Sequence, residues 1–586
     1  MAVPDSLHSN AASSTGSGRY SQRLPLVVAA FLFFLTVGTL LACAPEGNIS
    51  LKVIPTAGQS FKDATRMELV ISGDGLEKSP QTFEFDFTNS NGVVPGFAID
   101  PKAQNPFFFM KASLFDSNGT IIAFGSSQLP FVSKTVDRGL LISRVQDFGW
   151  LTILSSGAQS SSPRRLVGHK TVALPNGKIL IVGGTVEMRG NRGVYDIGQS
   201  SFLLQRLMIY SPQSGLIEFS NAALANPRAF HTATALPDGK VIIAGGLGFI
   251  NNQLSVLNSV EVYDPESDTL RSGFGLKKVR AFHTATLIGD SEIVMVGGIA
   301  SPMNATKRAL PVGQQVLEVE DYVVGASAES SKVTGALRYP VTSDGCGPFP
   351  APDKDTEVDG RFWHQTTRLD NNVLLVTGGI RVDDSGNREL PKHAILLKRN
   401  GTCWKPEKVE TGVTARFEHK ANVIELGGLR WAVVTGGRDL ENRVLSTVEV
   451  WGSTGDLVQG PGQLSQARYG HGTIVLPGQK LLVFGGIGDN QNAQNKAELF
   501  ELKQGSGGVK LEPISDFVAD ALFLKEVSGR FMPHAAISSL DPRVVVFGGA
   551  SRANVTNPTD AKEQIFTFSG QTSAELFTPK PIEDKK

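Results

Sequence analysis

The sequence predicts an all-β protein, with a seven-bladed β-propeller at residues 163–580 that follows a small β-sandwich at residues 44–148. Three observations lead to this prediction. A unit marked by a histidine and a glycine pair recurs seven times, the runs between these marks have the apolar patterns of strands, and turn residues separate them. The composition agrees, because 63 glycines and a charged content of 19% are typical of turn-rich β proteins.

The first 43 residues have the pattern of a secretory signal. Arg19 and Arg23 end a polar leader, residues 24–41 form an apolar run, and Cys43 follows the small residue Ala42. The segment resembles a bacterial lipoprotein signal peptide. This resemblance implies that Cys43 is lipidated, becomes the mature N-terminus and anchors the chain at the outer membrane or cell surface. Eighteen apolar residues are also long enough for an uncleaved signal anchor. In both cases the rest of the chain is exported.

The next hundred residues predict a separate β domain. Strand-like alternation occurs in six runs, at residues 49–54, 67–71, 82–87, 107–115, 121–124 and 140–145. Turn motifs such as Asn91-Gly92 separate them, and the pattern is similar to a β-sandwich of the immunoglobulin type. Residues 149–162 are expected to be a linker that includes a strand, near 150–154, able to close the propeller. Residues 581–586 form a charged tail.

Seven of the nine histidines define the repeat. An arginine stands three residues before the histidine in five copies and four residues before it in the first and last copies. The first glycine of the pair follows the histidine by 14 residues in six copies and by 17 in the copy at His419. The histidines are His169, His231, His283, His364, His419, His471 and His534, and the pairs are Gly183, Gly184, Gly245, Gly246, Gly297, Gly298, Gly378, Gly379, Gly436, Gly437, Gly485, Gly486, Gly548 and Gly549.

Each repeat predicts a four-stranded antiparallel unit. Turn formers such as Asn176-Gly177 stand seven residues after the histidine and predict a hairpin between the first and second strands. The run after this turn is almost wholly apolar, as at residues 179–182, so the second strand is buried on both faces. A third strand follows the glycine pair and often starts with a glutamate, as at Glu261 and Glu449. A less regular fourth strand precedes the next arginine. Such units close into a propeller.

These blades resemble the kelch family, in which a glycine pair ends the second strand and an aromatic residue follows on the third, as Tyr263 and Trp451 do here. The resemblance covers residues 164–579 and rests on seven copies. Most copies depart from the family because they lack its later tryptophan, which affects packing detail and leaves the fold prediction in place.

The blade topology predicts where a ligand binds. The turn between the first and second strands is short, so the longer connections lie on the opposite face, which we call the long-loop face. It receives five long segments, at residues 185–206, 299–316, 325–360, 504–526 and 550–572. Insertions collected on one face of a repeat array usually mark its binding surface.

The repeated histidines suggest a structural signature and no metal site. A seven-fold ring holds its copies too far apart for four of them to meet one ion at about 2 Å. We expect each histidine to bond backbone groups beside a glycine pair, and each arginine to lie over a neighbouring aromatic ring. The glycine pairs lack the lysine and helix of a phosphate loop. The sequence therefore predicts no metal, no cofactor and no catalytic residue.

Composition and motifs limit the function classes. Basic and acidic residues number 56 each, and the absence of net charge argues against a nucleic-acid partner. Copper radical oxidases of the kelch type need a Tyr-Cys crosslink and a ligand set of tyrosine and two histidines, whereas this chain has seven tyrosines and no Tyr-His dipeptide. The exported compartment allows Cys346 and Cys403 to form a disulfide. We predict a membrane-anchored scaffold that binds a protein or glycan through its long-loop face, with a carbohydrate-active enzyme as the alternative.

Overall fold

The computed structural model describes residues 47–579 with internal gaps, of which the longest are 152–165, 304–314, 337–359 and 515–529. The predicted signal segment with Cys43, the predicted cysteine partner Cys346 and the charged tail lie outside the described residues. Within the described residues, no helix is long and apolar enough to cross a membrane.

The N-terminal strands form one seven-stranded sheet with the order β3-β2-β5-β6-β7-β1-β4. Its apolar side chains alternate along each strand and share one core, as Met67, Leu69 and Ile71 do on β2. Phe83 of β3 and Phe97 of β4 have ring centroids 4.9 Å apart, so the sheet curls until its two edge strands meet. The immunoglobulin-like type stays a prediction. The strands are β1 (Gly47–Pro55), β2 (Arg66–Ser72), β3 (Gln81–Asp86), β4 (Val93–Ile99), β5 (Phe107–Phe115), β6 (Ile121–Pro130) and β7 (Val136–Arg144).

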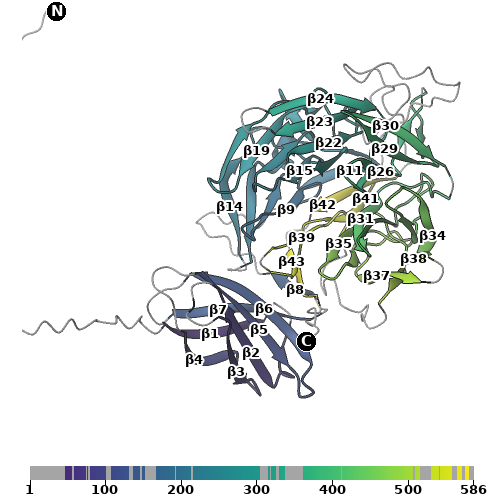
Figure 1. Ribbon diagram of the computed structural model, residues 1–586. Helices are drawn as coiled ribbons and strands as arrows, with labels where there is room; N and C mark the ends of the chain where they lie inside the picture. The colour runs from purple at the N-terminus through teal and green to yellow at the C-terminus, as the bar shows by residue number, and fades with distance from the viewer. Residues whose placement is uncertain are drawn as a thin grey trace, which may run out of the picture. The chain divides into compact units, whose positions relative to one another are not determined.

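Seven four-stranded blades follow, as the repeat predicts (Figure 1). Their strands, from the innermost outward, are β9 (Lys170–Ala173), β10 (Ile179–Val182), β13 (Arg206–Ser211), β14 (Leu216–Ala223) in blade 1; β15 (Thr232–Ala235), β16 (Val241–Ala244), β19 (Val260–Asp264), β20 (Thr269–Ser272) in blade 2; β21 (Thr284–Ile288), β22 (Glu292–Val296), β23 (Glu318–Val324), β24 (Glu329–Ala336) in blade 3; β25 (Gln365–Arg368), β26 (Val373–Thr377), β29 (Ala394–Asn400), β30 (Cys403–Val409) in blade 4. Blade 5 has β31 (Lys420–Leu426), β32 (Leu429–Thr435), β33 (Thr447–Trp451), β34 (Leu457–Gln463), and blade 6 has β35 (Gly472–Leu476), β36 (Lys480–Phe484), β37 (Glu498–Gly505), β38 (Gly508–Pro513).

Blade 7 is built from both ends of the repeat region. Its strands β39 (His534–Ile537), β40 (Val544–Phe547) and β43 (Ala574–Phe577) come from the last repeat, and β8 (Phe148–Leu151) pairs with β43 as the outer strand. The segment expected for this role, 150–154, begins two residues later than β8 does. Each innermost strand contacts the next, and β39 contacts β9, so the ring is closed.

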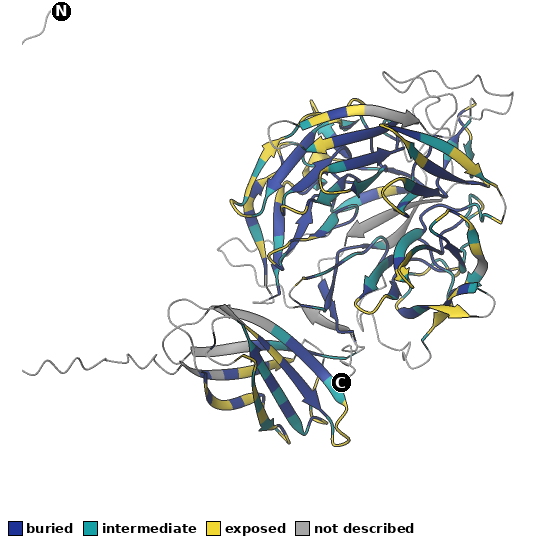
Figure 2. Ribbon diagram, viewed as in Figure 1, coloured by how far each residue is buried: buried dark blue, intermediate teal, exposed yellow. Residues whose placement is uncertain are grey.

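Burial follows the predicted pattern of the second strands. All four residues of β10 and of β16 are buried, since each of these strands lies in the middle of a blade with a neighbouring blade on either side. Figure 2 shows the buried residues concentrated along the middle strands of the blades. The apolar clusters join adjacent blades, as Leu180 of blade 1 and Val241 of blade 2 show. The wholly apolar second strands are therefore buried between neighbouring blades.

Additional hairpins extend the connection between the second and third strands in four blades. They are β11 (Glu187–Asn191) with β12 (Val194–Asp196), β17 (Leu247–Ile250) with β18 (Gln253–Val256), β27 (Arg381–Val382) with β28 (Arg388–Glu389), and β41 (Ala550–Thr556) with β42 (Gln564–Gly570). The 3-10 turn η1 (Ser200–Phe202) follows β12. Strand β11 of blade 1 pairs with β42 of blade 7, so two insertions make one four-stranded sheet. Ordered hairpins thus occupy the long-loop face.

Candidate functional site

The repeated arginine forms a buried ion pair with the glutamate that starts the third strand of its own blade. In blade 5, Arg416 lies 2.6 Å from Glu449, and both side chains are 1% exposed. The same arginine donates to the carbonyl of Gly436, the first glycine of the pair, at 2.8 Å. Four other blades repeat the ion pair, in Arg228–Glu261, Arg280–Glu320, Arg468–Glu498 and Arg530–Glu575.

The expected position of the arginine, over a neighbouring aromatic ring, is therefore wrong for these blades. The guanidinium points into its own blade, where a carboxylate and two backbone carbonyls compensate its buried charge, as the carbonyls of Gly436 and Thr447 do for Arg416. The sequence contained the signal, because the glutamate recurs at the start of the third strand. In blade 4 the carbonyl of His393 accepts a hydrogen bond from Arg361, as the carbonyl of Thr447 does from Arg416 in blade 5.

The glycine pairs of blades 1 to 5 each admit two histidines, and Pro533 takes the place of a histidine at Gly485 of blade 6 and Gly549 of blade 7. Both glycines have positive φ, 63° at Gly245 and 102° at Gly246, where a side chain is strained. A β-carbon on Gly245 would lie 2.8 Å from Cε1 of His283 in the next blade, and one on Gly246 would lie 2.8 Å from Cβ of His231 in its own blade. The glycine pair is thus a point of close contact between one blade and the next.

The histidine rings connect neighbouring blades through threonine hydroxyls. Nε2 of His283 lies 3.2 Å from the Thr232 hydroxyl of blade 2, and Nε2 of His471 lies 3.0 Å from the Thr435 hydroxyl of blade 5. His364 and His419 make the same contact with the blade before them. The partner in these four repeats is a side chain, where the sequence had suggested backbone groups.

The histidines are neutral at neutral pH and do not converge. Burial lowers the pKa of His169 and His364 to about 3, and it lowers the pKa of the other five well below the ordinary value. Among the described residues, no group of three or more His, Cys, Asp or Glu side chains could hold a metal ion.

One residue of each repeat, directly before the histidine in blades 1 to 6 and two residues before His534 in blade 7, forms a ring around the propeller axis, which we call the axial ring. Phe230, Phe282, Trp363, Glu418 and Met532 take left-handed backbone angles with φ between 54° and 59°, and the other two positions are Gly168 and Gly470. A non-glycine residue in this region costs on the order of 1–3 kcal/mol. The strain turns the side chains toward the axis, where Phe282 stacks at 4.6 Å on Phe230 and at 4.6 Å on Trp363.

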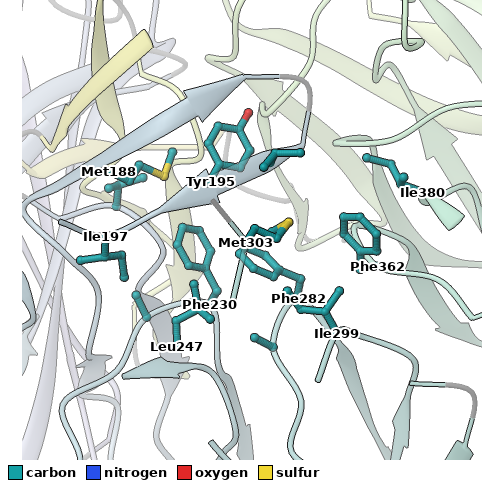
Figure 3. Packing of buried hydrophobic residues seen from close by; sticks show 14 of the residues in the cluster. Met188, Tyr195, Ile197, Phe230, Leu247, Phe282, Ile299, Met303, Phe362 and Ile380 are labelled. Atoms are coloured by element: carbon teal, nitrogen blue, oxygen red, sulfur yellow. The ribbon is translucent and has the colours of Figure 1, made fainter. Parts of the chain in front are cut away.

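The blade 1 hairpin β11–β12 covers the axial ring from the long-loop face. Gly193, in its turn, accepts a hydrogen bond of 2.8 Å from Nε1 of Trp363 in blade 4. The same glycine lies against Ile380 and Phe417, since a β-carbon there would approach their side chains to 2.4 and 3.1 Å. The cluster around it includes buried residues from all seven blades, and Figure 3 shows Tyr195 among them. This apolar cluster fills the axis at the long-loop face.

A polar triad is enclosed within this cluster. The Tyr195 hydroxyl donates to Glu418 at 2.5 Å, and Nε of Arg438 donates to the other Glu418 oxygen at 2.8 Å. Arg438 also contacts the Tyr195 hydroxyl at 3.1 Å. Burial and the Glu418 charge raise the pKa of Tyr195 well above its ordinary range, so the phenol keeps its proton. The triad fixes the hairpin of blade 1 to blade 5.

Behind the axial ring the propeller encloses a cavity of about 270 Å³. The first residues of the innermost strands line it, and they include Lys170, Thr232, Thr284, Gln365 and Lys420. Burial lowers the pKa of both lysines to about 8, and the charge of Lys420 contributes to the lowered pKa of Lys170. Neither lysine was predicted from the sequence, because their common position after a repeat histidine becomes meaningful only when the ring is closed.

The structure describes one of the two cysteines that were predicted to form a disulfide. Cys403 starts β30, is buried and is disulfide-bonded. Its pairing with Cys346 stays a prediction, since Cys346 lies outside the described residues.

Comparisons with known proteins were made for the whole chain. The Kelch motif family matches residues 227–269, which span blade 2 from just before Arg228. One solved structure, titled "Structure of YjhT", is 14% identical, has a TM-score of 0.40 and covers 60% of this chain and 99% of its own. No curated protein matches the chain.

The buried ion pair predicts a large loss of stability when one partner is removed. Arg416→Met leaves the Glu449 charge buried and should lower the free energy of unfolding by about 3–5 kcal/mol in urea titrations. The matched control is Lys398→Met, which breaks the Lys398–Glu407 pair, whose side chains are 46% and 55% exposed. That variant should cost about 0–1 kcal/mol. Equal losses in the two variants would contradict the structural role of the arginine.

The neutral histidines predict acid sensitivity that begins below pH 6.5. The unfolded chain binds protons there while the folded chain, with pKa values near 3 at His169 and His364, does not. Stability is therefore complete above pH 6.5 and falls as the pH decreases toward 3, by up to about 1.4 kcal/mol per pH unit for each histidine. Urea titrations between pH 7.5 and 5 measure this slope before most carboxylates titrate. His283→Gln should reduce this slope by the contribution of about one proton. An unchanged slope would refute the assignment of His283 as a neutral, buried histidine.

Proposed function

The chain is a kelch-repeat β-propeller protein, and from this premise we propose that it is an exported, membrane-anchored scaffold that binds a protein or glycan through its long-loop face. The observation that carries the proposal is the filled axis at this face. Because Gly193, Tyr195 and the axial ring occupy the centre, a ligand there meets the outer hairpins and not an axial pocket.

The hairpin β17–β18 supports contact with a partner. Its turn residues Asn251 and Asn252 have φ values of 50° and 62°, the left-handed geometry of a tight two-residue hairpin. Ile250 beside them is 49% exposed, so its side chain is accessible to a partner. A rigid hairpin loses little conformational entropy when it binds.

The chemistry of the cavity favours a binding protein over a sugar hydrolase. Hydrolysis of glycosidic bonds generally uses two carboxyl groups that flank the bond. Glu418 is the one carboxylate among the described residues that line the cavity, and Arg438 and Tyr195 hold both of its oxygens. A carboxylate committed in this way is not free to act as an acid or base.

The proposed interface predicts that a substitution in the β17–β18 hairpin weakens ligand binding, whereas a substitution on the opposite face does not. Ile250→Ser should weaken capture of a protein or glycan ligand by about tenfold if Ile250 is an anchor of the interface. The matched control is Leu429→Ser, because Leu429 is 51% exposed at the hairpin turn of blade 5 on the opposite face. Both variants are compared with the parent protein on a glycan array and in quantitative pull-downs from envelope extracts. Equal loss in both variants would argue against the long-loop face.

The proposed lipid anchor predicts that the protein incorporates radiolabelled palmitate in growing cells. Cys43→Ala should abolish the label, because a lipoprotein signal attaches the lipid to that cysteine. An uncleaved signal anchor would instead leave the parent protein unlabelled and at its full length on a denaturing gel. Label that persists in Cys43→Ala would rule out this site of lipidation.

A further inference from the structure

We infer that the axial cavity is a binding site for a small anion with two or more negative charges, held between Lys170 of blade 1 and Lys420 of blade 5. This site is separate from the long-loop face and does not depend on the function proposed for that face.

The two lysines occupy the same position in their repeats. Each directly follows a repeat histidine and opens an innermost strand, Lys170 in β9 and Lys420 in β31. Thr232, Thr284 and Gln365 take this position in blades 2, 3 and 4, and all five side chains line the cavity. Two non-adjacent blades therefore each place a lysine in the lining of one cavity.

No carboxylate compensates these charges within the described part of the chain. The ammonium group of neither lysine has an ion pair or a hydrogen bond there, whereas the repeat arginines of five blades have a glutamate each. Glu418 lines the same cavity but is committed to Arg438 and Tyr195. Like charges without a counter-ion are costly in an enclosed site, and an anion that bridges them removes the cost.

The surrounding groups complete a site for oxygen atoms. Gln365 has an amide N–H₂ that can donate, and the hydroxyls of Thr234 and Thr366 line the same space. The histidines around the cavity are neutral and do not compete for the anion's charge. The lining thus offers two cations with neutral donors beside them, which is the set that phosphate, sulfate or a short dicarboxylate requires.

The size of the cavity limits the ligand to a small ion. Its volume of about 270 Å³ lies below the range of roughly 300–1,000 Å³ that drug-sized ligands occupy. Phe230, Phe282 and Trp363 close the end that faces the long loops. A glycan chain or a peptide bound at the long-loop face is therefore separated from the lysines by the axial ring.

The test is calorimetric titration of the full-length protein with sodium phosphate, after dialysis into a phosphate- and sulfate-free buffer. We expect one site per chain, and at least a tenfold loss of affinity in Lys170→Met and in Lys420→Met. Lys510→Met is the matched control, because Lys510 is exposed on the outer strand of blade 6, and it should bind as the parent does. Sulfate and succinate distinguish a tetrahedral ion from a dicarboxylate, and sodium chloride at equal ionic strength controls for screening.

Thermal unfolding separates loss of the site from loss of the fold. In anion-free buffer the double variant Lys170→Met with Lys420→Met should melt a few degrees above the parent, since two uncompensated charges are gone, and phosphate should raise the melting temperature of the parent alone. Lys420→Arg keeps the charge and should retain binding within a few-fold. Absence of binding by phosphate, sulfate and succinate to the parent, or phosphate binding that persists in the double variant, would overturn the proposal.

Discussion

The fold depends on the contact between a glycine pair of one blade and the histidine of the next, which Pro533 replaces at the junction of blades 6 and 7. The first glycine has no side chain because the incoming imidazole occupies that space, as His283 does at Gly245 and His169 does at Gly548. The second case joins the last blade to the first, so the contact that stacks two blades also closes the ring. The buried Arg–Glu pair then holds the same glycine carbonyl from within the blade, as Arg416 does at Gly436. Packing between blades and hydrogen bonding within them thus meet at one backbone position.

This arrangement explains why the repeat could be found in the sequence and why its chemistry was only partly predicted. The histidine and the glycine pair have a nearly constant spacing because both belong to one hairpin, and the copy at His419 adds three residues in its longer strands β31 and β32. The glutamate partner follows an insertion of variable length, as the separation of 33 residues in Arg228–Glu261 and 45 in Arg530–Glu575 shows. Spacing alone could not connect them, although the recurrence of the glutamate could have suggested it.

The interior of the axis could not be predicted from the sequence, because it depends on contacts between distant repeats. Trp363 and Gly193 are 170 residues apart, and Tyr195 and Glu418 are 223 residues apart. No local pattern indicates that the hairpin of blade 1 crosses to blades 4 and 5. The left-handed residue of the axial ring is similarly hidden, since phenylalanine, tryptophan, glutamate and methionine share no propensity for that conformation. Closure by β8 was expected, by contrast, because the last repeat visibly lacked a fourth strand.

Function in such an array is most informative where one repeat departs from the others. Positions that agree in the repeats, the histidines and glycines above all, satisfy the geometry of blade stacking and say little about a ligand. The departures are concentrated at the axis: a glutamate in an axial ring whose other members are uncharged, and two lysines at a position that is otherwise neutral in the blades that line the cavity. Glu418 has its compensation in Arg438 and Tyr195, so its role is to hold the covering hairpin in place. The lysines, which are half-buried, have no such compensation in the described chain, and a charge in the cavity that the fold does not neutralise is best explained by a ligand that does neutralise it.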